Sequence, residues 1–215
     1  MPYPCYNTCM KRYIIDTNLF FNMEGSMGLG DTTADIIKTL VRAVEKAPSE
    51  ELEIVVPPTI VQEITSFFDS PDDPLLKSLF GSLTVKSPGT SEQSVSASIF
   101  EQLIEDYRDR AYRAMKVAEE EVIHTAEMFM GKEVLPQKEF QMACGKILTK
   151  LRERYRNATR TGTIDSKADF DLIMLAREMD GYLVTTDEGV TYWARLLGVK
   201  EMSSSVFGKK MQAYL

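Results

Sequence analysis

The residues that could carry out chemistry in this sequence are carboxylates, and two of them stand four positions apart at the start of a helical pattern. Asp165 and Asp169 precede the apolar residues 172–176, and a spacing of four places both side chains on one face of a helix. A short apolar strand follows and ends on a third carboxylate, Asp187. Such a group of acids could hold a divalent metal ion.

A fourth acid, Asp16, ends the first apolar strand of the chain. An acid in this position is costly unless something pairs with it, although a helix cap explains the segment equally well when it is taken alone. In a parallel sheet, the carboxyl ends of the strands and the starts of the following helices meet at one edge. We therefore expect Asp16 and Asp187 to share that edge with Asp165 and Asp169.

Three further acids are weaker candidates. Glu63 lies in the first turn of a predicted helix, where a capping box or the helix dipole explains it as well as metal binding does. Asp171 follows Asp169 by two residues, which rotates it off the shared face. Asp180 lies at the far end of the same helix.

The ligand types indicate which ion these acids would bind. Hard oxygen ligands without a set of thiolates or imidazoles suit Mg²⁺ or Mn²⁺, and four like charges repel one another unless a cation is present. His124 is the only histidine and falls in a long predicted helix, which argues against histidine-based catalysis and zinc hydrolysis. Carboxylates alone can support phosphodiester hydrolysis by water activated on a metal ion.

A long helical segment separates the first acid from the other three. Apolar residues repeat at spacings of four and three over residues 100–122, and a second stripe occupies residues 140–155 after a break that contains glycine and proline. These stripes predict an antiparallel helical hairpin, an arm at residues 95–157. Because alanine and polar residues make up much of it, the arm buries little by itself, and another copy of the chain is its simplest partner.

The end of this arm carries the one concentrated basic strip of the sequence. A solvated helix face explains the strip as well as a phosphate-contacting surface does. The net charge of −7 argues against a protein coated with basic surface, but it leaves room for a local strip. The candidate RNA contacts are Lys146, Lys150, Arg152, Arg154, Arg156 and Arg160.

The rest of the chain predicts one α/β core. Residues 11–94 and 158–215 alternate short apolar strands with helical segments, whereas residues 1–10 form a loose tail without periodicity. The sequence has no apolar run of about 20 residues, no signal peptide and no cysteine spacing typical of metal fingers. We therefore expect a cytoplasmic protein without membrane association or disulfides.

Four short motifs resemble those of PIN-domain nucleases, in the order found in that family. They lie at residues 14–18, 56–64, 169–176 and 183–187, on both sides of the arm. The resemblance implies a three-layer α/β/α fold with a parallel sheet, interrupted here by the inserted antiparallel hairpin. It also implies a metallonuclease site, in which Glu63 stands where many PIN domains have a glutamate that helps to hold metal.

Within this family, the chain more specifically resembles the RNA-free ribonuclease P proteins known as homologues of Aquifex RNase P. The features that carry this resemblance are the arm, the Asp165/Asp169 pair and the Thr-Thr-Asp-Glu-Gly segment. This resemblance implies Mg²⁺-dependent endonucleolytic removal of the 5′ leader from precursor tRNA, with catalysis by Asp16, Asp165, Asp169 and Asp187. It also implies a large homo-oligomer built through the arms.

Two alternatives to this function remain open at the level of sequence. One is a toxin-type PIN ribonuclease that cuts another RNA, which has no need of a long hairpin. The other is a non-catalytic PIN-like scaffold in RNA processing, against which the intact acids argue.

Overall fold

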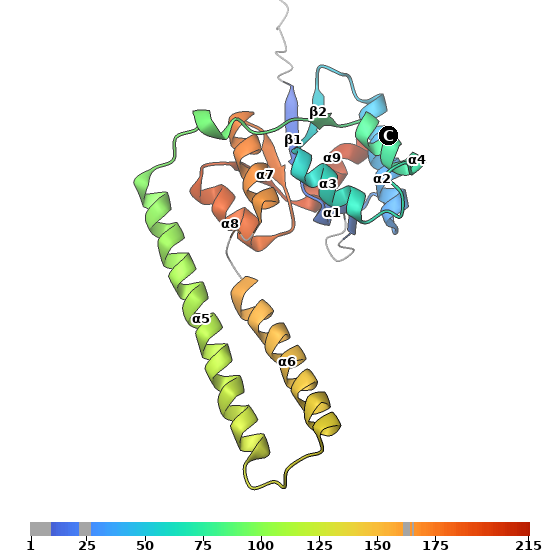
Figure 1. Ribbon diagram of the computed structural model, residues 1–215. Coiled ribbons are helices and arrows are strands. Elements are labelled where there is room, and N and C mark those ends of the chain that lie inside the picture. Colours follow the sequence, from blue (N-terminus) through green and yellow to red (C-terminus); the bar gives the residue numbers. More distant parts are fainter. Residues whose placement is uncertain (1–9, 22–26, 161–163, 165) are drawn as a thin grey trace, which may run out of the picture. The chain divides into compact units, whose positions relative to one another are not determined.

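The structure is a computed structural model that describes residues 10–21, 27–160, 164 and 166–215 (Figure 1). Of the predicted N-terminal tail, only Met10 is among the described residues, and the predicted site residue Asp165 lies outside them. The described chain forms two compact units: a core from the residues up to 94 and from 164 onward, and an arm between residues 95 and 163.

The core is built on one parallel sheet, whose described strands stand in the order β3–β2–β1–β4–β5. The sequence predicts four of these strands but not the edge strand β5, because two of its three residues are charged. The strands are β1 (Lys11–Ile15), β2 (Leu52–Val56), β3 (Thr84–Val85), β4 (Tyr182–Val184) and β5 (Lys200–Met202).

The strand order reverses direction between β1 and β4. The chain runs outward from β1 through β2 to β3, then returns to the other side of β1 with β4 and β5. At such a switch point, the connections after two neighbouring strands leave in opposite directions and open a crevice at the carboxyl ends. Ile15 pairs with Val184, so Asp16 and Thr185 follow the two strands at the same level.

Helices cover both faces of this sheet. Helices α3 and α8 contact α7, whereas α1, α4 and α9 contact α2. Ile14 and Ile15 point to opposite faces of β1 and are both fully buried, which confirms the predicted three-layer α/β/α arrangement. The core helices are α1 (Asn18–Phe21), α2 (Thr33–Lys46), α3 (Pro58–Ser66), α4 (Pro74–Gly81), α7 (Lys167–Glu178), α8 (Glu188–Leu196) and α9 (Ser204–Gln212), and a short 3₁₀ turn, η2, spans Thr90–Glu92.

Two helix boundaries differ from those expected. Helix α3 begins at Pro58, because the fixed φ of proline suits the first helical position. Glu63 therefore lies in its second turn rather than in the first turn, where it was expected. The second arm helix continues to Arg160, three residues beyond the expected end of the arm at residue 157. No glycine or proline interrupts this last turn, and the Thr159 hydroxyl donates to the Tyr155 carbonyl at 2.8 Å.

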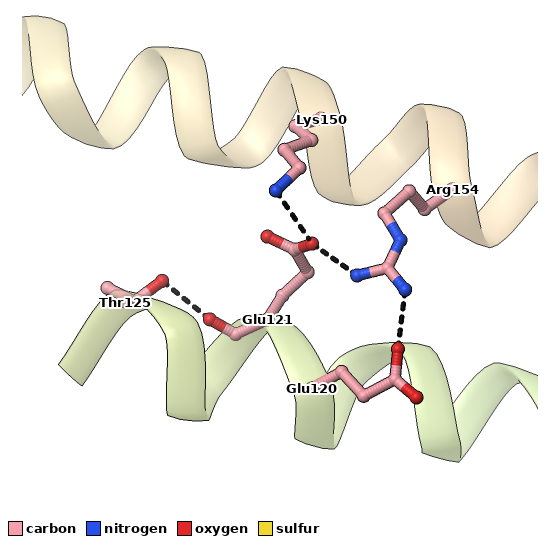
Figure 2. A network of polar contacts seen from close by, with 5 residues as sticks. All are labelled: Glu120, Glu121, Thr125, Lys150 and Arg154. Carbon is pink, nitrogen blue, oxygen red and sulfur yellow. Dashed lines mark hydrogen bonds and ion pairs between the residues drawn. The ribbon is translucent and has the colours of Figure 1, made fainter. Parts of the chain in front are cut away.

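The arm is a hairpin of two long helices, α5 (Ala97–Phe129) and α6 (Gln137–Arg160). Figure 2 shows the ion pairs that join them: Arg154 contacts both Glu120 and Glu121, and Lys150 lies 3.4 Å from the Glu121 carboxylate. The hydrogen bond from Arg154 and the charge of Lys150 lower the pKa of Glu121. The two helices are thus linked through charged side chains rather than through an apolar seam alone.

Most large apolar side chains of the arm are exposed. Among the described arm residues, Val117 is the only apolar side chain that is buried. Exposed side chains include Phe100, Ile104, Tyr107, Tyr112, Met115, Val122, Ile123, Phe140, Met142, Leu148 and Tyr155.

No helix in the described ranges combines the length and apolarity needed to cross a membrane.

Candidate active site

Asp16 lies directly after β1, at the switch point of the sheet. Its backbone N–H donates to the Val184 carbonyl at 3.1 Å, which continues the pairing of β1 with β4 by one residue. The side chain is 6% exposed. Its Oδ2 accepts a hydrogen bond of 2.6 Å from the Thr185 hydroxyl. The sheet and the neighbouring strand therefore fix both the backbone and one carboxylate oxygen of this residue.

The Thr185 hydroxyl makes three hydrogen bonds at the end of β4. While donating to Asp16, it accepts hydrogen bonds from Asn18 Nδ2 at 3.1 Å and from the backbone N–H of Asp187 at 3.0 Å. Asn18 Oδ1 in turn accepts from the backbone N–H of Thr186 at 3.4 Å. One hydroxyl thus uses its donor and both acceptor positions to connect two acids and the segment after Asp16.

Asp169 and Asp187 are placed by the starts of two helices. Ser166 caps α7 and accepts from the backbone N–H of Asp169 at 3.0 Å, so Asp169 lies in the first turn. Asp187 caps α8, and its Oδ1 accepts from the backbone N–H of Val190 at 3.0 Å. Helix starts favour negative charge, which makes both positions suitable for carboxylates.

A pocket of about 430 Å³ brings these acids together at one edge of the sheet. Its lining includes Thr17 and Asn18, which follow β1, as well as two phenylalanines at the ends of α1 and α3. The described acids that line it are Asp16, Glu63, Asp169 and Asp187. Four of the five predicted site acids therefore share one pocket, and the fifth, Asp165, lies outside the described residues.

Glu63 and Asp171 have different surroundings. Glu63 lines the pocket, where its Oε2 accepts a hydrogen bond of 2.9 Å from the Thr17 hydroxyl. Asp171 does not line it; its buried carboxylate accepts a hydrogen bond of 3.1 Å from the Thr59 hydroxyl and thereby ties α7 to α3. This placement agrees with the helical rotation that separates Asp171 from Asp169.

The negative charges in the pocket act on one another. Burial raises the pKa of Asp16 to about 6, and the nearby charges of Asp169 and Glu63 add to this effect. The hydrogen bonds from Thr185 and from the Asn18 backbone partly oppose it. The ionised form of Asp16 is therefore less favourable here than in water, and positive charge nearby would stabilise it.

A divalent cation fits this pocket by donor chemistry and by charge. Carboxylate oxygens are preferred ligands of Mg²⁺ and Mn²⁺. A cation would relieve the repulsion that adds to the effect of burial on the pKa of Asp16. Among the described residues, no group of three or more acidic, histidine or cysteine side chains is already arranged to hold an ion. Side-chain rearrangement, or ligands outside those residues, would be needed to complete such a site.

Comparison with known proteins extends over almost the whole chain. The PINc domain ribonuclease family matches residues 12–215. A protein named RNA-free ribonuclease P from Thermococcus kodakarensis is 33% identical over 201 residues, which cover 94% of both chains. Proteins of the same name from Pyrococcus furiosus and Thermodesulfovibrio yellowstonii are 33% and 30% identical, with coverage of 92% and 88% of this chain and 91% and 88% of theirs.

The chain belongs to the RNA-free ribonuclease P family. Its PINc domain makes it a member of a ribonuclease family, as the four motifs predict. The coverage is too high for the arm of 69 residues to lie outside the matched region in these relatives. The sequence segment that forms the arm is therefore included in the match to these relatives.

The basic strip of the arm is partly engaged in ion pairs within the arm. Lys150 and Arg154 contact Glu120 and Glu121 of α5, so their charges are balanced locally. The remaining candidates of the strip are on the same helix α6, namely Lys146, Arg152, Arg156 and Arg160. Contact of these residues with RNA stays a prediction.

Polar residues that no sequence motif marks as functional hold the acids of the pocket in place. The motifs at residues 14–18 and 183–187 contain Asn18 and Thr185 without assigning either a role, although both connect Asp16 to the end of β4. Thr17 likewise donates a hydrogen bond to Glu63. Their position next to acids at strand ends is the sequence feature that could have indicated this role.

Proposed function

We propose that this protein is an endoribonuclease that removes the 5′ leader from precursor tRNA and depends on Mg²⁺ or Mn²⁺. The observation that carries the proposal is similarity along nearly the full chain, core and arm alike, to proteins named RNA-free ribonuclease P. The pocket of acids at the switch point of the sheet supports a hydrolytic site in the core.

Each pocket residue has a distinct part in this proposal. Asp16, Asp169 and Asp187, together with Asp165, would hold the metal, with Glu63 as an additional ligand. A bound divalent ion supplies an activated water and stabilises the leaving oxygen of a phosphodiester. Thr185 and Thr17 orient carboxylates through hydrogen bonds of 2.6 and 2.9 Å, which keeps those acids from turning away from the pocket.

The arm contributes to this function through its surface. Its exposed apolar side chains support packing against other copies of the chain, and we propose a large homo-oligomer formed through the arms. The six residues of the basic strip are the candidates for contact with the phosphates of precursor tRNA. For Lys150 and Arg154, this contact would replace or extend their ion pairs with Glu120 and Glu121.

A cleavage assay with product mapping tests the proposal. The purified protein with Mg²⁺ should release an intact leader from a labelled precursor tRNA and leave a single mature 5′ end, and a chelator should abolish the reaction. A matched precursor without leader should remain uncut. Absence of cleavage by folded protein, or cutting at scattered positions in both RNAs, would contradict the proposed function.

A further inference from the structure

Two aromatic rings line the pocket of acids. Phe21 is the last residue of α1, and Phe67 follows the end of α3. Their rings are stacked, with centroids 4.0 Å apart and an angle of 19° between the planes. The Phe67 side chain is 57% exposed. The pocket thus has a flat apolar surface at its edge, in addition to its carboxylates.

The neighbours of both rings fix this surface. Phe20, beside Phe21, is fully buried, and so is Ile64, one turn before Phe67. The backbone N–H of Phe67 donates to the carbonyls of Ile64 and Thr65. The exposed ring is therefore attached to rigid elements of the core rather than to a loose connection.

The chemistry of the pocket limits what the rings can bind. The described lining residues comprise four acids, two polar residues and the two phenylalanines, without a lysine or arginine. The protein side chains at this place can therefore attract RNA through ring stacking but not through ion pairs with phosphate. Every nucleobase has a flat face, whereas bases inside a duplex already stack on both sides, so an unpaired base is the suitable ligand.

We propose that Phe21 and Phe67 form a stacking platform for an unpaired nucleobase of the RNA next to the phosphodiester held at the acids. The inference rests on the proposed ribonuclease function and adds a base-binding subsite to it. A protein partner is the less suitable occupant, because the buried centre of a protein interface is depleted of acidic residues. A cation held by the carboxylates, as proposed above, would offset their repulsion of an RNA phosphate.

Substitutions of Phe67 separate stacking from simple apolar contact. Phe67→Leu keeps an apolar side chain but removes the ring, and it should raise the KM for precursor tRNA roughly 5- to 100-fold. Phe67→Trp should restore wild-type KM. Tyr192→Leu is the matched control: this aromatic side chain is 40% exposed but does not line the pocket, and its loss should leave KM unchanged.

The RNA provides the complementary test. We would prepare a series of precursors, each with one abasic nucleotide at a different position around the cleavage site. One precursor of this series should bind wild-type protein more weakly than the others. At that position Phe67→Leu should cause no additional loss, because the contact is already absent. Equal KM values for wild type and Phe67→Leu on every precursor would overturn the platform.

The Phe67→Trp protein also reports stacking without cleavage. The native chain has a single tryptophan, Trp193, which is 2% exposed, so an added indole at position 67 would dominate quenching by RNA. A short single-stranded RNA added with Mg²⁺ present should quench it, and an abasic chain of equal length should not. Equal quenching by both chains would overturn the proposal.

These measurements also distinguish failure of the proposed ribonuclease function, and a role of the rings in a protein interface, from absence of base stacking. Failure of wild-type protein to cut any precursor would reject the proposed ribonuclease P function, whereas the quenching assay would still decide whether the rings stack on a base. A changed oligomer mass of Phe67→Leu, with RNA binding unaltered, would assign the rings to a protein interface and overturn the platform.

Discussion

The core and the arm of this protein are stabilised in different ways. In the core, large side chains such as Phe20, Leu175 and Trp193 are almost completely buried between the sheet and its helices. In the described arm, Val117 is the only buried apolar residue, while rings and aliphatic chains remain exposed along both helices. The core can thus be stable by itself, whereas the arm presents a surface suited to another molecule.

The carboxylates of the two units also have different neighbours. Glu120 and Glu121 of the arm are paired with Arg154, and Lys150 lies beside Glu121. The acids of the core pocket face one another without a lysine or arginine among the described lining residues. Paired charges link two helices, whereas grouped like charges reduce stability and prepare a site for a cation.

Matched truncations should show the largest difference between the two units. Ile64 is fully buried in the core, and Ile104 is 61% exposed in the arm. Ile64→Ala should lower the free energy of unfolding by about 2–5 kcal/mol, and Ile104→Ala should change the core transition by less than about 0.5 kcal/mol. Denaturant unfolding followed by Trp193 fluorescence measures both, and equal losses would contradict the comparison.

Removal of the charge of Asp16 should stabilise the core at neutral pH. Its pKa in the folded protein, about 6, exceeds the ordinary value of 3.8, so the folded state binds the proton more tightly. Stability without metal should therefore fall as pH rises from about 4 to 6 and stay low above that range. Asp16→Asn removes this penalty and should be more stable at pH 7 by up to about 3 kcal/mol.

Thermal unfolding in chelator at pH 4 and pH 7 tests this prediction. The advantage of Asp16→Asn should be present at pH 7 and almost absent at pH 4. Added Mg²⁺ should raise the melting temperature of wild type more than that of the variant. A variant less stable than wild type at pH 7 would show that the ionised carboxylate is favoured in the fold.

A charge on the exposed arm surface should disturb assembly without unfolding the core. Ile104→Glu places a carboxylate where we expect a second copy to pack, at a cost of roughly 1–3 kcal/mol per interface. On dilution, the variant oligomer should therefore dissociate at a protein concentration that is at least roughly 10-fold higher than for wild type. Light scattering over a dilution series measures this shift, and Glu119→Gln, which removes rather than adds charge on the same helix, serves as the control.

The smallest effect should come from the ion pairs of the arm. Glu121→Gln keeps the shape of the side chain but removes the charge that contacts Arg154 and Lys150. We expect a slight loss of helical signal at elevated temperature and no change in the core transition. High salt should reduce the difference between wild type and variant, and a large loss of core stability would contradict the separation of the two units.

The sequence predicts the sheet and the acid-lined edge because both depend on local patterns. Apolar strands that end at Asp16 and near Asp187, together with the helix start at Asp169, are sufficient to place these residues by parallel-sheet geometry. The edge strand β5 could not be predicted, since its residues are largely polar and its pairing with β4 depends on the folded sheet.

The tertiary contacts of the site could not be derived from sequence spacing. Thr185 donates to a carboxylate 169 positions away, and Thr17 reaches Glu63 across 46 positions. The stacking of Phe21 on Phe67 likewise joins two helices that no periodicity links. Such contacts follow from the way the strands and helices pack, and single-sequence patterns contain no information about them.

The most direct test of the account is single-turnover cleavage of precursor tRNA by two variants with substitutions near opposite ends of one helix. Asp169 and Asp180 lie near opposite ends of α7, one at the pocket and the other exposed and ion-paired with Lys200. The account predicts that Asp169→Ala lowers the cleavage rate by about 10³-fold or more, while Asp180→Asn keeps the wild-type rate. Near-wild-type cleavage by folded Asp169→Ala would contradict an active site at this pocket.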